Sequence, residues 1–311
     1  MGGACLSLLE SGDHAMERIL RDWKYVFFFV APALILYSAL LLVPIFWSMG
    51  YSLFDGFPIS GFRFMGFGNY LRAWKDQDFL RSFWFSAKYA LVVTPGQIGL
   101  GFLLSLLYFL VLKRASRLSV LIRTLVFFPV VLPTVAVAQM FVKLFEITLQ
   151  YGLVNAILDV LGLDGWIRPF LGRGDTAFWV AASMNIWTAM GFYAVLLYSG
   201  LLDIPQELIE SARLDGASGW NLVRLIITPL LRPLFITSTI FSLNGTLKVF
   251  DQILALTGGG PGKSTTPLTL YMYRTAFHYN QYGYGSTIAV ILTIECLLVT
   301  GILSFFRQKT E

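Results

Sequence analysis

The chain carries at residues 203–233 the segment DIPQELIESARLDGASGWNLVRLIITPLLRP, the longest amphipathic, charge-bearing stretch between two hydrophobic spans in its second half. Pro205 suits the first position of a helix, where its missing N–H costs nothing. Asp215-Gly216 should end that helix, because glycine adopts the left-handed conformation common at helix C-termini. A second short helix is expected over about Ser218–Thr228, and Pro229 and Pro233 mark the start of the next membrane helix.

Apolar residues recur at helical spacing in both short helices, with charged residues elsewhere on their surfaces. They are Leu208, Ile209 and Ala212 in the first helix and Trp220, Val223 and Ile227 in the second. The pattern predicts a compact helix–turn–helix at a membrane surface with one face available for docking. An inert connector is the alternative.

Composition predicts a polytopic membrane protein. The 311 residues are 56% hydrophobic and only 13% charged, whereas a soluble protein is typically about a quarter charged, and the mean hydropathy is +0.69. The net charge of +5 fits attraction to anionic lipid and gives no indication of a nucleic-acid partner.

Hydrophobic stretches long enough to cross a bilayer predict an all-α fold with six transmembrane helices after a cytoplasmic tail at residues 1–23. Prolines are tolerated in such helices, although Pro129 and Pro133 interrupt the third. The expected spans within the 24–311 transmembrane domain are 25–47, 89–112, 125–145, 177–201, 230–249 and 284–306, with the linking segment 203–229 between the fourth and fifth.

Basic residues in short loops mark the cytoplasmic side of a membrane protein. A cluster follows the second span at Lys113, Arg114, Arg117 and Arg123, which predicts that both termini are cytoplasmic. The first loop is basic as well, so this asymmetry is incomplete.

The segment TGGGPGKST, Thr257–Thr265, ends like a phosphate-binding P-loop. Thr257 stands where that motif requires glycine, and Pro261 removes an N–H from a loop that binds phosphate through N–H groups. A tight turn outside the membrane is the better interpretation. No motif for a metal, a cofactor or a catalytic reaction is apparent, and an enzyme is not expected.

Polar residues near the spans are candidates for a substrate path, because burying them in lipid is costly. Amide and aromatic groups of the kind that hold sugars are Asn185, Trp187 and Tyr193 in span four and Asn244 in span five, with Lys248 at the end of span five. The alternative is that such groups, and Glu295 in span six, join helices by hydrogen bonds.

The motif ESARLDGASGWNLVRLIITP resembles the cytoplasmic coupling loop of bacterial ABC-importer permeases, which reads EAA, then DGA, then a more distant Ile-x-Leu-Pro. The match lies at Glu210-Ser211-Ala212, Asp215-Gly216-Ala217 and Ile226–Pro229, with Ser211 and Thr228 as departures. Phe250–Phe277, FMGFGNY at Phe64–Tyr70 and FFPVVLPTVA at Phe127–Ala136 are similar to the carbohydrate-type members.

The resemblance implies a sugar permease that pairs with a second, homologous permease, two ATP-hydrolysing subunits and an outer solute-binding protein in the bacterial inner membrane. It implies that Glu210, Ala212, Asp215, Gly216 and Ala217 form the coupling element, with Glu210 in polar contact with the ATPase and Gly216 in the tight turn. Three alternatives stay open: a carrier or channel that works alone, a structural scaffold, and a permease for glycerol-3-phosphate, which would favour a cation such as Lys248.

Overall fold

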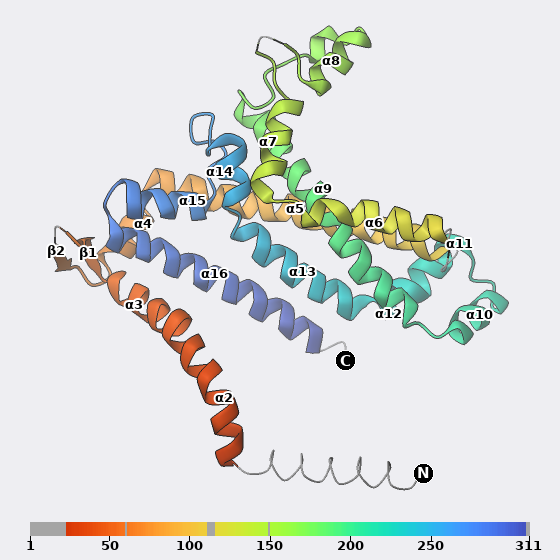
Figure 1. Ribbon diagram of the computed structural model, residues 1–311, viewed down its shortest axis with the longest axis horizontal. Coiled ribbons are helices and arrows are strands. Elements are labelled where there is room, and N and C mark those ends of the chain that lie inside the picture. The colour runs from red at the N-terminus through yellow and green to blue at the C-terminus, as the bar shows by residue number, and fades with distance from the viewer. Residues whose placement is uncertain (1–22, 60, 111–115, 149, 309–311) are drawn as a thin grey trace, which may run out of the picture.

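The structure is a computed structural model that describes residues 23–59, 61–110, 116–148 and 150–308. The fold is mainly helical, as expected, and Figure 1 shows the small hairpin and α10 at opposite ends of the molecule. The long helices are α5 (Gln77–Leu110), α9 (Gly174–Leu202), α13 (Arg232–Leu247) and α16 (Tyr282–Gln308). The 1–22 part of the predicted tail, and Lys113 and Arg114, lie outside the described residues.

Shorter elements link these helices. Three of them, η1, η3 and η4, are single π-helical turns, and η2 is a 3-10 turn. The elements are α2 (Trp23–Tyr37), η1 (Ser38–Leu42), α3 (Val43–Tyr51), α4 (Gly68–Ala73), α6 (Arg117–Val131), α7 (Thr134–Leu144), α8 (Leu153–Val160), η2 (Asp164–Trp166), α10 (Gln206–Leu214), α11 (Gly219–Leu222), η3 (Val223–Ile227), α12 (Thr228–Leu230), α14 (Asp251–Thr257), α15 (Leu268–Tyr273) and η4 (Arg274–His278).

Four helices in the described part of the chain are long and apolar enough to cross a membrane, and two bent pairs raise the total to six if each pair is one span. The six-span count therefore stays a prediction. The four helices are Phe27–Tyr51, Gln77–Leu110, Gly174–Leu202 and Tyr282–Arg307. The second of them begins 12 residues before the expected start at 89, because the polar first turns continue the same helix.

Both bends coincide with prolines. α6 and α7 meet at 98°, because Leu132 is extended, at φ −70° and ψ 142°, as the residue before a proline usually is. The expected span 125–145, which its prolines were predicted to interrupt, is thus two nearly perpendicular helices. The other pair, Gly219–Leu230 and α13, is bent by 70°, and a proline lies in the first turn of α13.

A two-stranded antiparallel hairpin departs from the all-α expectation. β1 (Phe54–Phe57) pairs with β2 (Gly61–Phe64), with Phe54 opposite Phe64. The amide of buried Asn69 holds the hairpin to the chain, because its Nδ2 donates to the carbonyl of Phe54 at 2.8 Å. We call the end of the molecule that carries this hairpin, α4, α15 and the first turns of α5 and α16 the hairpin end.

The main core lies where α5 packs against α9, α7 and α14. Tyr89, Met184 and Ile253 are fully buried there. A second cluster joins α5 to α15 and α16 through Phe79, Leu268 and Ile288. These contacts fix α5 and α9 side by side, so polar residues on their facing sides lie close together.

The first apolar span stands apart from this core. Only 6% of its most apolar window, within Phe27–Tyr51, is buried, and Figure 1 shows α2 extending away from the other helices. Phe28 is 73% exposed and Leu40 is 71% exposed. Such an apolar surface needs cover from lipid or from another protein.

Candidate functional site

The linking segment forms the helix–turn–helix that its sequence predicts. α10 begins one residue after Pro205, and the second helical stretch covers Gly219–Leu230. Ile209 and Ala212 of α10 and Val223 and Ile227 of the second stretch pack in one apolar cluster with Leu106 of α5 and Leu201 of α9. Leu208 and Trp220, which the periodicity placed on the same faces, are instead 48% and 69% exposed.

The turn between the two helices is a Schellman motif. Gly216 has φ +86°, its N–H donates to the carbonyl of Arg213 at 3.1 Å, and the N–H of Ala217 donates to the carbonyl of Ala212 at 2.8 Å. These two bonds satisfy carbonyls that the end of α10 leaves free. The positive φ explains why glycine occupies this position. The predicted role of Gly216 in a tight turn therefore has a geometric basis.

The face of α10 that points away from the core is polar and exposed. Glu210 accepts a hydrogen bond from Nε2 of Gln206 at 2.8 Å. Asp215 is exposed too, and Leu214 between them is 89% exposed. α10 lies at one end of the molecule (Figure 1). An exposed large apolar side chain flanked by carboxylates makes a surface suited to a protein partner.

A polar cavity of about 310 Å³ lies between α5, α9, α13 and α14. Two predicted substrate-path residues, Asn185 and Tyr193, line it and are only 7% and 5% exposed. Half of its other lining residues carry an amide or a hydroxyl group, and its single carboxylate is Asp251. The amides and hydroxyls belong to Gln97, Thr134, Ser242, Thr246 and Gln252, and the remaining lining residues are Ala189, Gly245, Val249 and Phe250.

A directed chain of hydrogen bonds crosses this cavity. Ser242 Oγ donates to Gln97 Oε1 at 2.6 Å, and Gln97 Nε2 donates to Asn185 Oδ1 at 2.6 Å. Asn185 Nδ2 in turn donates to Gln252 Oε1. Four helices are thereby joined through side chains that can also bind a hydroxyl-rich molecule. Sequence reasoning missed Gln97, Ser242 and Gln252, although an amide within an apolar span, as at Gln97, was an available signal.

The other three predicted path residues lie outside this cavity. The ring of Trp187 packs 5.9 Å from that of Phe141. Asn244 donates to Thr300 Oγ1 at 2.9 Å and so joins α13 to α16, which is the helix-joining alternative. Lys248 is exposed at the C-cap of α13. Oε2 of Glu295 is buried without a hydrogen-bond partner in the described part of the chain.

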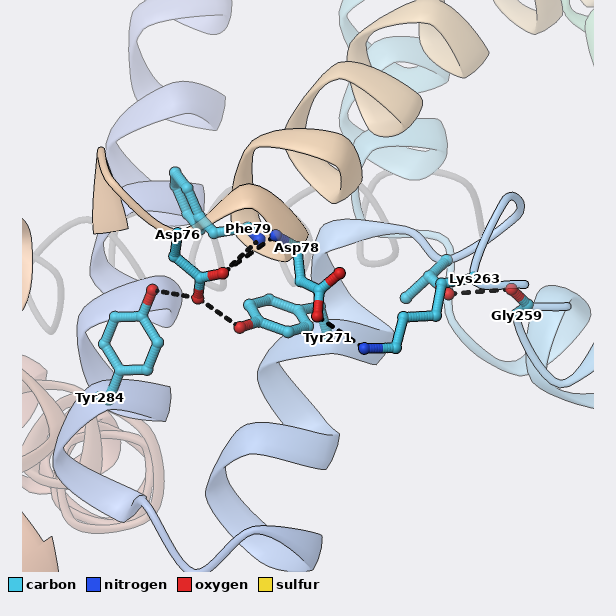
Figure 2. Close-up of polar contacts among 8 residues, drawn as sticks. Asp76, Asp78, Phe79, Gly259, Lys263, Tyr271 and Tyr284 are labelled. Atoms are coloured by element: carbon cyan, nitrogen blue, oxygen red, sulfur yellow. Dashed lines mark hydrogen bonds and ion pairs between the residues drawn. The ribbon is translucent and has the colours of Figure 1, made fainter. Parts of the chain in front are cut away.

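A carboxylate ties the hairpin end together, as Figure 2 shows. Asp76 accepts hydrogen bonds from the hydroxyls of Tyr271 at 2.5 Å and Tyr284 at 2.8 Å, and from the N–H groups of Asp78 and Phe79. Partial burial raises the pKa of Asp76, but these four hydrogen bonds outweigh it and hold that pKa below its ordinary value.

The glycine-rich loop after α14 closes onto the same region (Figure 2). Lys263 Nζ lies 2.6 Å from Asp78 Oδ2, and this hydrogen bond, above all, raises the pKa of Lys263. The lysine of the P-loop-like motif is therefore engaged by a carboxylate of α5, and the loop follows a helix, not a strand. Among the described residues, no group of three or more His, Cys, Asp or Glu side chains could hold a metal ion.

The sequence of the chain matches a known protein family and several of its curated members. The family model described as "Binding-protein-dependent transport system inner membrane component" matches residues 97–311. Among curated relatives, the multiple sugar-binding transport system permease protein MsmF of Streptococcus mutans is 33% identical, over 92% of this chain and 94% of that protein. The sulfoquinovosyl glycerol transport system permease protein SmoG of Agrobacterium fabrum is 32% identical, over 97% of this chain and 93% of that protein.

Solved structures share the fold. A chain of a bacterial alginate ABC transporter, solved in complex with an alginate pentasaccharide-bound periplasmic protein, superimposes with a TM-score of 0.82 at 22% identity. The superposition covers 95% of this chain and 98% of that chain. At this identity the likeness concerns the fold.

Proposed function

The chain belongs to the family of binding-protein-dependent transport system inner membrane components, and from this membership we propose that it is the permease of an ABC importer for a sugar. The observation that carries the proposal is the linking segment. Its exposed Glu210 and Leu214 lie on α10, and Asp215 lies at the C-cap of α10. The opposite face of α10 is anchored on α5 and α9. A push on that segment would reach the helices that line the polar cavity.

The proposed partners follow from the surfaces that the fold leaves uncovered. The α10 end would dock in a cleft of one ATP-binding subunit, and a second, homologous permease would carry the equivalent segment to another. The exposed span Phe27–Tyr51 offers this second permease an apolar surface. In this arrangement the α10 end and both termini face the cytoplasm of the cell, and the hairpin end faces an outer solute-binding protein.

The cavity supports a sugar as the cargo in preference to glycerol-3-phosphate. Its lining offers amides and hydroxyls, which pair with uncharged hydroxyl groups, and Asp251 would repel a phosphate. Lys248, the cation that an anionic cargo would favour, lies outside the lining. Competition of labelled sugar uptake by unlabelled sugars and by glycerol-3-phosphate tests this: inhibition by glycerol-3-phosphate alone would contradict it.

The experiment that tests the whole proposal reconstitutes the chain in liposomes with and without the other subunits. We expect uptake and substrate-stimulated ATP hydrolysis only in the complete assembly. Uptake by this chain alone would establish a carrier or channel instead. Undiminished uptake by cells lacking the chain would favour a scaffold.

Glu210→Lys refines the test within the complete assembly. Reversal of an exposed charge on the docking face should remove the substrate stimulation of ATP hydrolysis while the permease still inserts. Glu207→Lys is the matched control, since Glu207 is exposed on the same helix outside the matched motif. Wild-type stimulation in Glu210→Lys would contradict the coupling role.

A further inference from the structure

A second recess, separate from the polar cavity, lies at the hairpin end between the first turns of α5, the first turns of α9 and the loop after α14. Its volume is about 800 Å³. The side chains that give it its character are Arg81, Trp84, Lys88, Asp175, Trp179 and Lys263. We call it the α5–α9 groove.

The groove lies near the level of a membrane–water interface. α5 has 34 residues and is therefore about 51 Å long at 1.5 Å per residue, whereas the hydrocarbon core is about 30 Å thick. The charged residues of α5 all lie in its first turns, so these are the turns that extend beyond the apolar layer. Trp84 and Trp179 are 68% and 60% exposed, and exposed tryptophans in membrane helices concentrate at the headgroup level.

The charge in the groove is predominantly positive. Asp175 Oδ1 lies 3.4 Å from Arg173 Nε, and Lys263 forms an ion pair with Asp78, so the charges of Asp175 and Lys263 are each balanced by a neighbour. Arg81 and Lys88 have no acidic partner within the described residues, and Lys88 Nζ lies 4.5 Å from the ring centroid of Phe178. Arg81, Trp84 and Lys88 follow one another at i, i+3 and i+7, so they share one face of α5.

We propose that the α5–α9 groove binds the phosphate-bearing headgroup of an anionic phospholipid in the leaflet at the hairpin end. Arg81 and Lys88 contact the phosphate, and the rings of Trp84 and Trp179 flank the glycerol and the first methylenes of the acyl chains. A lipid fits better than a protein partner, because a mobile anion flanked by interfacial tryptophans matches both the charge and the depth of the groove.

The size of the expected lipid preference follows from Arg81 and Lys88, the two cations without an acidic partner among the described residues. A cation near a membrane surface contributes about 1 kcal/mol towards anionic lipid, so two of them predict a roughly tenfold to thirtyfold preference for an anionic over a zwitterionic headgroup. The preference should fall as the salt concentration rises, because the groove is open to solvent.

The test uses the assembled transporter in nanodiscs that contain phosphatidylglycerol or phosphatidylcholine. Native mass spectrometry measures which lipid is retained, and quenching by the corresponding brominated lipids reports contact with tryptophan. The wild type should retain and be quenched by phosphatidylglycerol preferentially. Arg81→Gln/Lys88→Gln should lose the preference, and Trp84→Phe/Trp179→Phe should lose the difference in quenching. Lys75→Gln removes an exposed cation outside the groove and should change neither.

Four outcomes would overturn the proposal. They are equal retention of the two lipids by the wild type, an unchanged preference in the Arg81→Gln/Lys88→Gln variant, displacement of the lipid by millimolar inorganic phosphate, and absence of quenching because another subunit covers the groove. Size-exclusion chromatography of the assembled variant checks that it folds, and the single variant Lys88→Gln, with an expected loss of severalfold, supplies a second measurement if the double variant does not assemble.

Discussion

Gly216 joins the two helices of the linking segment. Its replacement by valine tests whether the backbone conformation of this turn is needed for coupling to ATP hydrolysis. A Cβ at this position would meet no atom within 4 Å, so the first atom of a new side chain has room. The cost worked out here is that of the backbone conformation: φ is +86°, and an L-residue in the left-handed region costs about 1–2 kcal/mol. That corresponds to a factor of roughly 5–30 in the population of the native turn.

We expect Gly216→Val to reduce substrate-stimulated ATP hydrolysis in the assembled transporter by at least about fivefold, because α11 no longer leaves α10 at the native angle. Insertion of the chain into the membrane should be unchanged, as measured by the amount of chain recovered in washed membranes. Gly216→Asn should retain most of the stimulation, since asparagine tolerates this conformation.

A matched glycine distinguishes a local effect from general strain. Gly162 also has a positive φ, +67°, with nothing within 4 Å of a built Cβ, but it follows α8, away from the linking segment. Gly162→Val should therefore leave stimulation intact. Equal loss in both valine variants, or wild-type stimulation in Gly216→Val, would refute the reasoning.

Two further predictions concern other parts of the molecule. Gln97→Leu removes the donor to Asn185 and the acceptor for Ser242, so buried polar groups lose their partners at a cost of about 1–3 kcal/mol each, and sugar uptake should fall. The control Gln139→Leu removes an exposed amide that donates to Ala255 and should leave uptake unchanged. A loss of uptake in Gln139→Leu but not in Gln97→Leu would contradict the role of the cavity. The depressed pKa of Asp76 means that its carboxylate contributes stability above its unfolded pKa of about 3.9, and that this contribution is lost as the pH falls through the lower folded pKa. Thermal unfolding at a series of pH values should show a midpoint that declines below about pH 4 in the wild type and less steeply in Asp76→Asn, and parallel curves would show that Asp76 is not responsible.

The local features of the linking segment were accessible from its sequence, because they depend on near neighbours. The helix stop at Asp215-Gly216 and the break near Pro133 follow from backbone preferences of single residues. The angles between the helices on either side of such breaks do not follow from these preferences. The 98° angle between α6 and α7 and the exposure of Trp220 depend on which helices pack against the segment.

The polar cavity could be predicted only in part, for the same reason. Asn185 and Tyr193 were recognised as polar groups in an apolar span. Gln97 and Gln252 acquire their meaning only when α5 and α14 bring them to Asn185. The hairpin was missed because each of its strands has only four residues, too few for an alternating pattern to stand out.

The π-helical turn η3 decides where the linking segment can change in length. Its ring is closed by the N–H of Thr228 donating to the carbonyl of Val223, five residues back, one residue more than an α-helical turn contains. The extra residue is absorbed within this one turn, so deletion of a single residue inside η3 would leave an α-helical turn and α10 would keep nearly its present direction relative to α13. Deletion of a residue from the α-helical part of α10 would instead rotate the residues beyond it by about 100°. A change in chain length is therefore tolerated in η3, and the same change in α10 would turn the docking face away.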